Sequence, residues 1–217
     1  MSITNKEKIK HVLPHIAFVV LYAVFLFIYL KVENQNNRLI RIAEVSSDNI
    51  SMIFTMHFMS SILVLIVIVF INHYRKKSLS NLGICIKHPV IIAVLSVVYL
   101  GFFIIRGNFS VGGIYTAFFY LVVVAFLEEL IFRGYLFGVL NESFDNATSV
   151  VISGIIFGAM HAITPIIING TNPLIVVSSE IGGGIVASAF FVFLYRKSGT
   201  LLIPILVHAL LDYCPLR

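Results

Sequence analysis

The stretch Leu121–Arg133 reads LVVVAFLEELIFR, which places two adjacent carboxylates and an arginine directly after an apolar run. A charged side chain at the centre of a bilayer costs about 2.5–3.5 kcal/mol on insertion scales, so ionisable residues inside such segments are candidates for function. Glu128, Glu129 and Arg133 therefore indicate a membrane-spanning helix that carries chemistry.

The composition of the whole chain supports a lipid environment. Of the 217 residues, 59% are hydrophobic and 12% are charged, and the mean hydropathy is +1.01. Soluble proteins have about 45–50% apolar and about 25% charged residues. The net charge of +5 comes from basic clusters between apolar runs, as at residues 6–10 and 75–77. Topology and anionic lipid headgroups explain such clusters, so the bilayer is an expected partner and nucleic acid is not.

A spanning helix needs about 20 predominantly apolar residues. We predict an all-α, polytopic transmembrane bundle of about seven helices, at residues 12–31, 50–72, 89–105, 114–140, 148–168, 174–195 and 200–214. The distribution of lysine and arginine favours a multi-pass protein of the cell membrane with its N-terminus inside and its C-terminus outside. Residues 1–113 carry no recognised motif, and we expect 114–217 to form a catalytic helix bundle.

Helical spacing separates the two glutamates. Glu129 and Arg133 are four residues apart, so they share a helix face and are expected to pair. Glu128 is rotated from that face by about 100°. It is therefore less neutralised by the arginine and is the better candidate for a general base. A buried ion-pair cluster without catalytic function is the alternative.

Two further apolar segments carry polar side chains. The fifth contains Phe157-Gly-Ala-Met-His161, and the seventh contains His208-Ala-Leu-Leu-Asp212. A lone histidine in an apolar helix is more often a packed, hydrogen-bonded residue than a site residue. Polar groups on separate membrane helices usually face the bundle interior, however, so Glu128, His161 and His208 are predicted to share one cavity.

Glycines predict a close contact between helices. Gly154 and Gly158 form a G-x-x-x-G pattern, a spacing that lets two helix backbones approach closely. Gly182–Gly184 lie in the middle of the sixth segment. These three glycines predict either a second close contact or a local break in the helix, and packing is the favoured interpretation.

These three polar motifs, in this order, resemble the CPBP family, named for CAAX prenyl endopeptidases and bacteriocin processing and also called Abi. Its pattern is E-E-x-x-x-R, then F-x-x-x-H, then H-x-x-x-N or D. The resemblance implies an all-helical intramembrane endopeptidase in which Glu128 and His161 activate water. It also implies that His208 and Asp212 stabilise the oxyanion, with Glu129, Arg133 and Phe157 in supporting positions.

Asp212 stands where eukaryotic members of that family typically have asparagine. An ionised aspartate cannot donate a hydrogen bond to an oxyanion. It can accept one from His208 and orient it, or it can act while protonated, so its role stays open. The resemblance also implies a substrate that is a small peptide or a membrane-associated precursor, in bacteriocin self-immunity or secreted-peptide processing.

The sequence leaves alternatives open for both the mechanism and the function. A metal-free mechanism without a cofactor is favoured, but Glu128, His161 and His208 would also suit zinc, because two histidines and a glutamate form a known catalytic ligand set. Intramembrane glutamate and histidine also mark proton relays, so a proton-coupled transporter is the second hypothesis. Transporters often have repeated halves, and none is visible in this sequence. The third hypothesis is a non-catalytic membrane scaffold or immunity protein.

Overall fold

The computed structural model describes residues 4–214, and over this range the chain is helical and contains no β-strand. Six helices of the described chain are long and apolar enough to cross a membrane: Asn5–Gln35, Ile50–Tyr74, Pro89–Arg106, Val111–Ser143, Asn146–Asn169 and Pro173–Ser198. A shorter apolar helix, Leu202–Tyr213, follows them. The protein is therefore a multi-pass membrane protein, and the prediction of an all-α fold with about seven helices is confirmed.

The first helix, α1 (Asn5–Gln35), begins earlier than the predicted 12–31. Thr4 and Glu7 form a capping box, in which the Thr4 backbone N–H donates to the Glu7 carboxylate at 2.8 Å and the Glu7 N–H donates to the Thr4 hydroxyl at 3.3 Å. Hydropathy detects only the apolar part of a helix. The polar first turns of α1 therefore lie outside the predicted range.

Two compact units can be distinguished in the chain. The first comprises the chain up to Asn36 together with Ile131–Phe193, and the second comprises Asn37–Leu130 together with the chain from Leu194 onward. This grouping rests on spatial contacts. The boundary predicted between residues 113 and 114 rests on motifs and stays a prediction.

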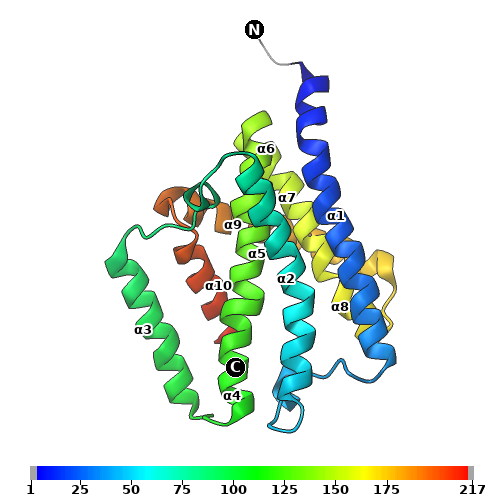
Figure 1. The fold of residues 1–217 in the computed structure, drawn as a ribbon, viewed down its shortest axis with the longest axis vertical. Helices are drawn as coiled ribbons and strands as arrows, with labels where there is room; N and C mark the ends of the chain where they lie inside the picture. The colour runs from blue at the N-terminus through cyan, green and yellow to red at the C-terminus, as the bar shows by residue number, and fades with distance from the viewer. Residues whose placement is uncertain (1–3, 215–217) are drawn as a thin grey trace. The chain divides into compact units, whose positions relative to one another are not determined.

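Each unit has its own packing. In the first, α1 packs against α6 (Gly138–Ser143) and α8 (Ile163–Asn169), and α7 (Asn146–His161) contacts both α6 and α8. In the second, which also holds α2 (Ile50–Tyr74), α10 (Leu202–Tyr213) packs against α3 (Pro89–Arg106) and η3 (Phe119–Phe126). The red α10 and the green α3 can be followed in Figure 1.

The span Val111–Ser143 changes its helical form along its length. It begins with α4 (Val111–Phe118), continues as the π-helix η3, and has one short α-helical turn, α5 (Leu127–Glu129). A second π-helix, η4 (Leu130–Phe137), then leads into α6. π-Helical stretches are rare and are frequent at functional sites. The glutamate pair thus lies in a short α-helical turn between two π-helices.

Glycines bring α7 and α9 (Pro173–Ser198) into close contact within the first unit. A Cβ atom on Gly154 would lie 2.7 Å from the Ile185 Cα, and one on Gly184 would lie 2.5 Å from the Gly154 carbonyl oxygen. The Ser153 and Ser188 hydroxyls form a buried hydrogen bond at 2.9 Å. Because α9 runs without a break from Pro173 to Ser198, the packing interpretation of its glycines is confirmed at Gly184.

Candidate active site

His208 is the centre of a polar cluster in the second unit. It lies on α10 and is 5% exposed, and its Nδ1 is 2.8 Å from Oε1 of the fully buried Glu129. Because a carboxylate accepts hydrogen bonds, the Nδ1–H of His208 donates to Glu129. This bond fixes the orientation of the imidazole ring and places a proton on Nδ1.

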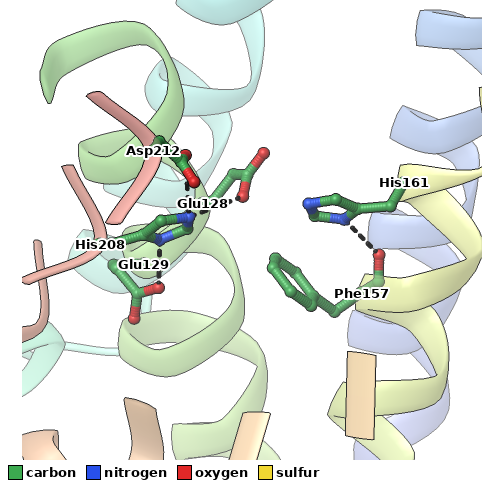
Figure 2. Close-up of polar contacts among 6 residues, drawn as sticks. All are labelled: Glu128, Glu129, Phe157, His161, His208 and Asp212. Atoms are coloured by element: carbon green, nitrogen blue, oxygen red, sulfur yellow. Dashed lines mark hydrogen bonds and ion pairs between the residues drawn. The ribbon is translucent and has the colours of Figure 1, made fainter. Parts of the chain in front are cut away.

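The other ring nitrogen of His208 lies near two more carboxylates (Figure 2). Its Nε2 is 3.4 Å from Oδ2 of Asp212 and 3.7 Å from Oε2 of Glu128. Asp212 is four residues further along α10 and reaches His208 along the same helix face. A doubly protonated His208 would therefore donate from Nδ1 to Glu129 and present an N–H from Nε2 beside Glu128 and Asp212.

The three carboxylates differ in exposure. The side chain of Glu129 is 0% exposed, whereas those of Glu128 and Asp212 are 27% and 35% exposed. Glu129 is thus placed as an internal support for His208. Glu128 and Asp212 are the carboxylates that water or a ligand can reach.

His161 is the last residue of α7 in the first unit. Its Nδ1 is 2.9 Å from the carbonyl oxygen of Phe157, one turn earlier, as Figure 2 shows. A carbonyl oxygen only accepts, so Nδ1 carries the hydrogen, and in the neutral ring the basic lone pair is on Nε2. The rings of Phe157 and His161 also contact each other, with centroids 4.3 Å apart.

Arg133 is fully buried in the first unit and lies against two aromatic rings. Its guanidinium carbon is 4.3 Å from the ring centroid of Phe157 and 5.0 Å from that of Phe191. Both distances suit cation–π interaction. Phe157 therefore supports two motif residues, Arg133 through its ring and His161 through its carbonyl. Phe191 was not predicted from the sequence.

The structure thus brings together Glu128, Glu129, His208 and Asp212 in one unit, and Arg133, Phe157 and His161 in the other. A cavity shared by Glu128 and His161 stays a prediction, as does the pairing of Glu129 with Arg133. Within residues 4–214, no group of three or more histidine, cysteine, aspartate or glutamate side chains is arranged to hold a metal ion. The zinc set predicted from the sequence combines residues of both units and also stays a prediction.

A polar cavity of about 440 Å³ lies beside the His208 cluster, entirely within the second unit. Its walls include the polar side chains of Arg106, Asn108, Thr116, Tyr120 and Asp212. Asp212 therefore faces this cavity while its carboxylate remains 3.4 Å from the His208 ring.

Residues 108–214 match the family described as type II CAAX prenyl endopeptidase Rce1-like. The matched segment contains all three motifs, and the match confirms the resemblance to CAAX-type membrane proteases that these motifs predict. No curated protein and no solved structure matches the chain.

Proposed function

We propose that this membrane protein, whose residues 108–214 belong to the Rce1-like family of type II CAAX prenyl endopeptidases, hydrolyses a peptide bond within the bilayer. The observation that carries the proposal is the position of His208 among the carboxylates of Glu128, Glu129 and Asp212. Peptide hydrolysis needs an activated water, a donor to the tetrahedral oxyanion and a proton for the leaving amine. This cluster contains groups suited to each task.

In the proposed reaction, Glu128 is the general base. Its carboxylate takes a proton from a water molecule as the water oxygen bonds to the carbonyl carbon of the substrate. The Nε2–H of His208 donates to the resulting oxyanion. When the intermediate collapses, the C–N bond breaks and the proton held by Glu128 passes to the amine. The F-x-x-x-H motif suggests that His161 assists in activating the water, and the basic lone pair on its Nε2 is the group that would do so.

The supporting roles follow from the hydrogen bonds. Glu129 orients His208 by accepting from Nδ1 at 2.8 Å. Asp212, 3.4 Å from Nε2, is suited to accept the Nε2–H and orient the ring before the reaction, and the same N–H is shared with the oxyanion once it forms. This geometry favours the accepting role of Asp212 over the role of a protonated donor.

We further propose that the water is activated without a metal ion and that the substrate is a small peptide or a membrane-associated precursor. Processing of secreted peptides or bacteriocin self-immunity is the proposed setting. The zinc alternative predicts that a chelator abolishes cleavage and that zinc restores it.

The test is cleavage of a pool of synthetic secreted peptides by the full-length protein in detergent or lipid, followed by mass spectrometry. General acid–base catalysis contributes about 10²–10⁴-fold, so Glu128→Gln should lower kcat by at least about 10²-fold while peptide binding survives. Asp212→Asn is the matched control. Because asparagine also carries an accepting oxygen, this variant should retain substantial activity.

Each outcome of this test has a distinct meaning. Undiminished cleavage by Glu128→Gln would end its assignment as the base. Chelator-sensitive cleavage restored by zinc would make the same residues metal ligands. Proton movement across vesicles by a protein that cleaves nothing would favour the transporter hypothesis, and the absence of both activities would favour a scaffold or immunity protein.

A further inference from the structure

The polar cavity of about 440 Å³ in the second unit contains two charged wall residues, Arg106 and Asp212. Asp212 belongs to the proposed catalytic cluster, since its carboxylate lies 3.4 Å from the His208 ring. A molecule in this cavity would therefore touch both Arg106 and a residue of the site. Arg106 has no role in the mechanism proposed above.

Arg106 contacts the end of the same helix that carries His208. It is the last residue of α3, and its guanidinium carbon lies 4.6 Å from the ring centroid of Tyr213 at the end of α10. The Tyr213 ring is 3% exposed and contacts Tyr99, with centroids 5.2 Å apart. The guanidinium of the exposed Arg106 thus lies against a buried tyrosine ring at the cavity wall.

The chemistry of this wall suits an anionic group. Among the described residues, Arg106 forms no ion pair within 4.0 Å, so no carboxylate of residues 4–214 neutralises it. A guanidinium presents five N–H donors in a planar fork that matches a carboxylate. Asp212 on another wall is already beside His208 and would repel an anion, which leaves Arg106 as the anchor for it.

The basic residues of the second unit indicate from which side a ligand arrives. Arg75–Lys77 follow α2, Lys87 precedes α3, and Arg196 and Lys197 lie near the end of α9. Arg106 ends the helix that Lys87 precedes, so the cavity lies at the opposite end of α3 from this basic cluster. Under the positive-inside rule, the basic end is cytoplasmic and the cavity end is not.

We propose that this cavity admits a peptide from the non-cytoplasmic side, and that Arg106 is a specificity-determining residue that binds a carboxylate of this peptide. The carboxylate is either the C-terminus of the peptide or an aspartate or glutamate side chain. The inference rests on the proposed function and adds to it the substrate class and the side of access. A lipid phosphate on Arg106 is the competing outcome of the test.

The test uses the full-length protein in phosphatidylcholine nanodiscs. Each cleaved peptide is synthesised in three forms: unmodified, amidated at the C-terminus, and with acidic side chains replaced by amides. Arg106→Gln should raise KM roughly 10- to 100-fold for the unmodified peptide with kcat nearly unchanged, because a hydrogen bond to a charged group is lost equally from the ground state and the transition state. The peptide form that lacks the recognised carboxylate should already have the raised KM with the wild-type protein. Its KM should not rise further with Arg106→Gln.

Arg41→Gln is the matched control. Arg41 lies at the same end of the second unit, precedes η1 (Ile42–Glu44), is 85% exposed and pairs with Glu44 at 3.6 Å. It does not line the cavity, so KM should be unchanged. An unchanged KM in Arg106→Gln, or an equal rise for all three peptide forms, would overturn the inference. An effect of Arg106→Gln that appears only with anionic lipid would assign the residue to a headgroup and also overturn it.

A binding measurement separates this inference from the proposed function. Immobilised Glu128→Gln protein, with and without Arg106→Gln, is exposed to the same peptide pool and to an amidated pool, and retained peptides are identified by mass spectrometry. Retention that requires both Arg106 and a carboxylate supports the inference even if the unmodified protein cleaves nothing. Cleavage without any carboxylate preference refutes the inference alone, and absence of both binding and cleavage refutes both.

Discussion

At the scale of single residues, the hydrogen bond between Glu129 and His208 is the contact that the sequence could not predict. Spacing along one helix predicts a pairing of Glu129 with Arg133, four residues away, and that pairing stays a prediction. The structure gives Glu129 a hydrogen bond to His208, which is 79 positions away in the chain. Helical periodicity describes only residues on the same helix, so no pattern in the sequence could reveal this bond.

The Glu129–His208 bond leads to a prediction about orientation. Glu129→Ala leaves a buried N–H without its acceptor, which should lower the free energy of unfolding by about 1–3 kcal/mol. It should also lower kcat per folded molecule, because His208 loses the hydrogen bond that orients its ring from Nδ1. Glu129→Gln keeps an accepting oxygen and should recover more of kcat. The measurements are chemical unfolding in detergent and kcat normalised to folded protein. Full kcat in Glu129→Ala would contradict the orienting role.

Arg133 shows a different limit of the sequence. The E-E-x-x-x-R motif identifies Arg133 as a candidate, and the F-x-x-x-H motif identifies Phe157. The structure has the Arg133 guanidinium carbon 4.3 Å from the ring centroid of Phe157. Phe191 lies against the same guanidinium at 5.0 Å but is one of 19 phenylalanines in an apolar chain. An aromatic residue in a membrane helix carries no periodic signal of its own, so this contact required the structure.

At the scale of elements, hydropathy located the spans well and their internal form poorly. The third predicted span, 89–105, is observed as Pro89–Arg106, and the second, 50–72, as Ile50–Tyr74. The π-helices on either side of Glu128 and Glu129 were not predicted. Hydropathy depends only on composition, so it is the same for the apolar run LVVVAF in an α-helix and in a π-helix. The two forms differ only in whether each backbone N–H bonds to the carbonyl four or five residues earlier.

The contact between α7 and α9 leads to a prediction with internal controls. An added Cβ at Gly184 would lie 2.5 Å from the Gly154 carbonyl oxygen, whereas one at Gly182 or Gly183 would meet nothing within 4 Å. Gly184→Ala should therefore lower stability by about 1–3 kcal/mol through overpacking. Gly182→Ala and Gly183→Ala should not be destabilising. Thermal unfolding of the three variants in one detergent tests this, and equal midpoints would refute close packing at Gly184.

At the scale of the whole molecule, the prediction that the two ends of the chain lie on opposite sides of the membrane requires an odd number of crossings. The seventh helix decides this number, and its length alone does not predict a crossing. The 12 residues of α10 are about 18 Å long, whereas the hydrocarbon core of a bilayer is about 30 Å thick. Tyr213 nevertheless lies against Arg106, the last residue of α3. The end of α10 therefore reaches the same level as the end of a longer apolar helix.

Two native cysteines at opposite ends of the second unit provide a test of orientation. Cys85 lies in the loop before α3, beside Lys87, and its thiol donates to the Gly199 carbonyl at 3.5 Å. Cys214 directly follows α10 at the cavity end. Both are free and partly exposed. A membrane-impermeant maleimide added to intact cells should label Cys214 and leave Cys85 unlabelled until the membrane is permeabilised.

The single variants Cys85→Ser and Cys214→Ser identify which thiol reacts. Burial raises the pKa of the Cys214 thiol, so less of it is thiolate near neutral pH. Since the thiolate is the nucleophile, its labelling should accelerate as the pH rises from about 7 toward that pKa. Labelling of Cys85 alone on intact cells would invert the predicted orientation. It would place the Arg106–Asp212 cavity on the cytoplasmic side, and substrates would then have to come from the cytoplasm.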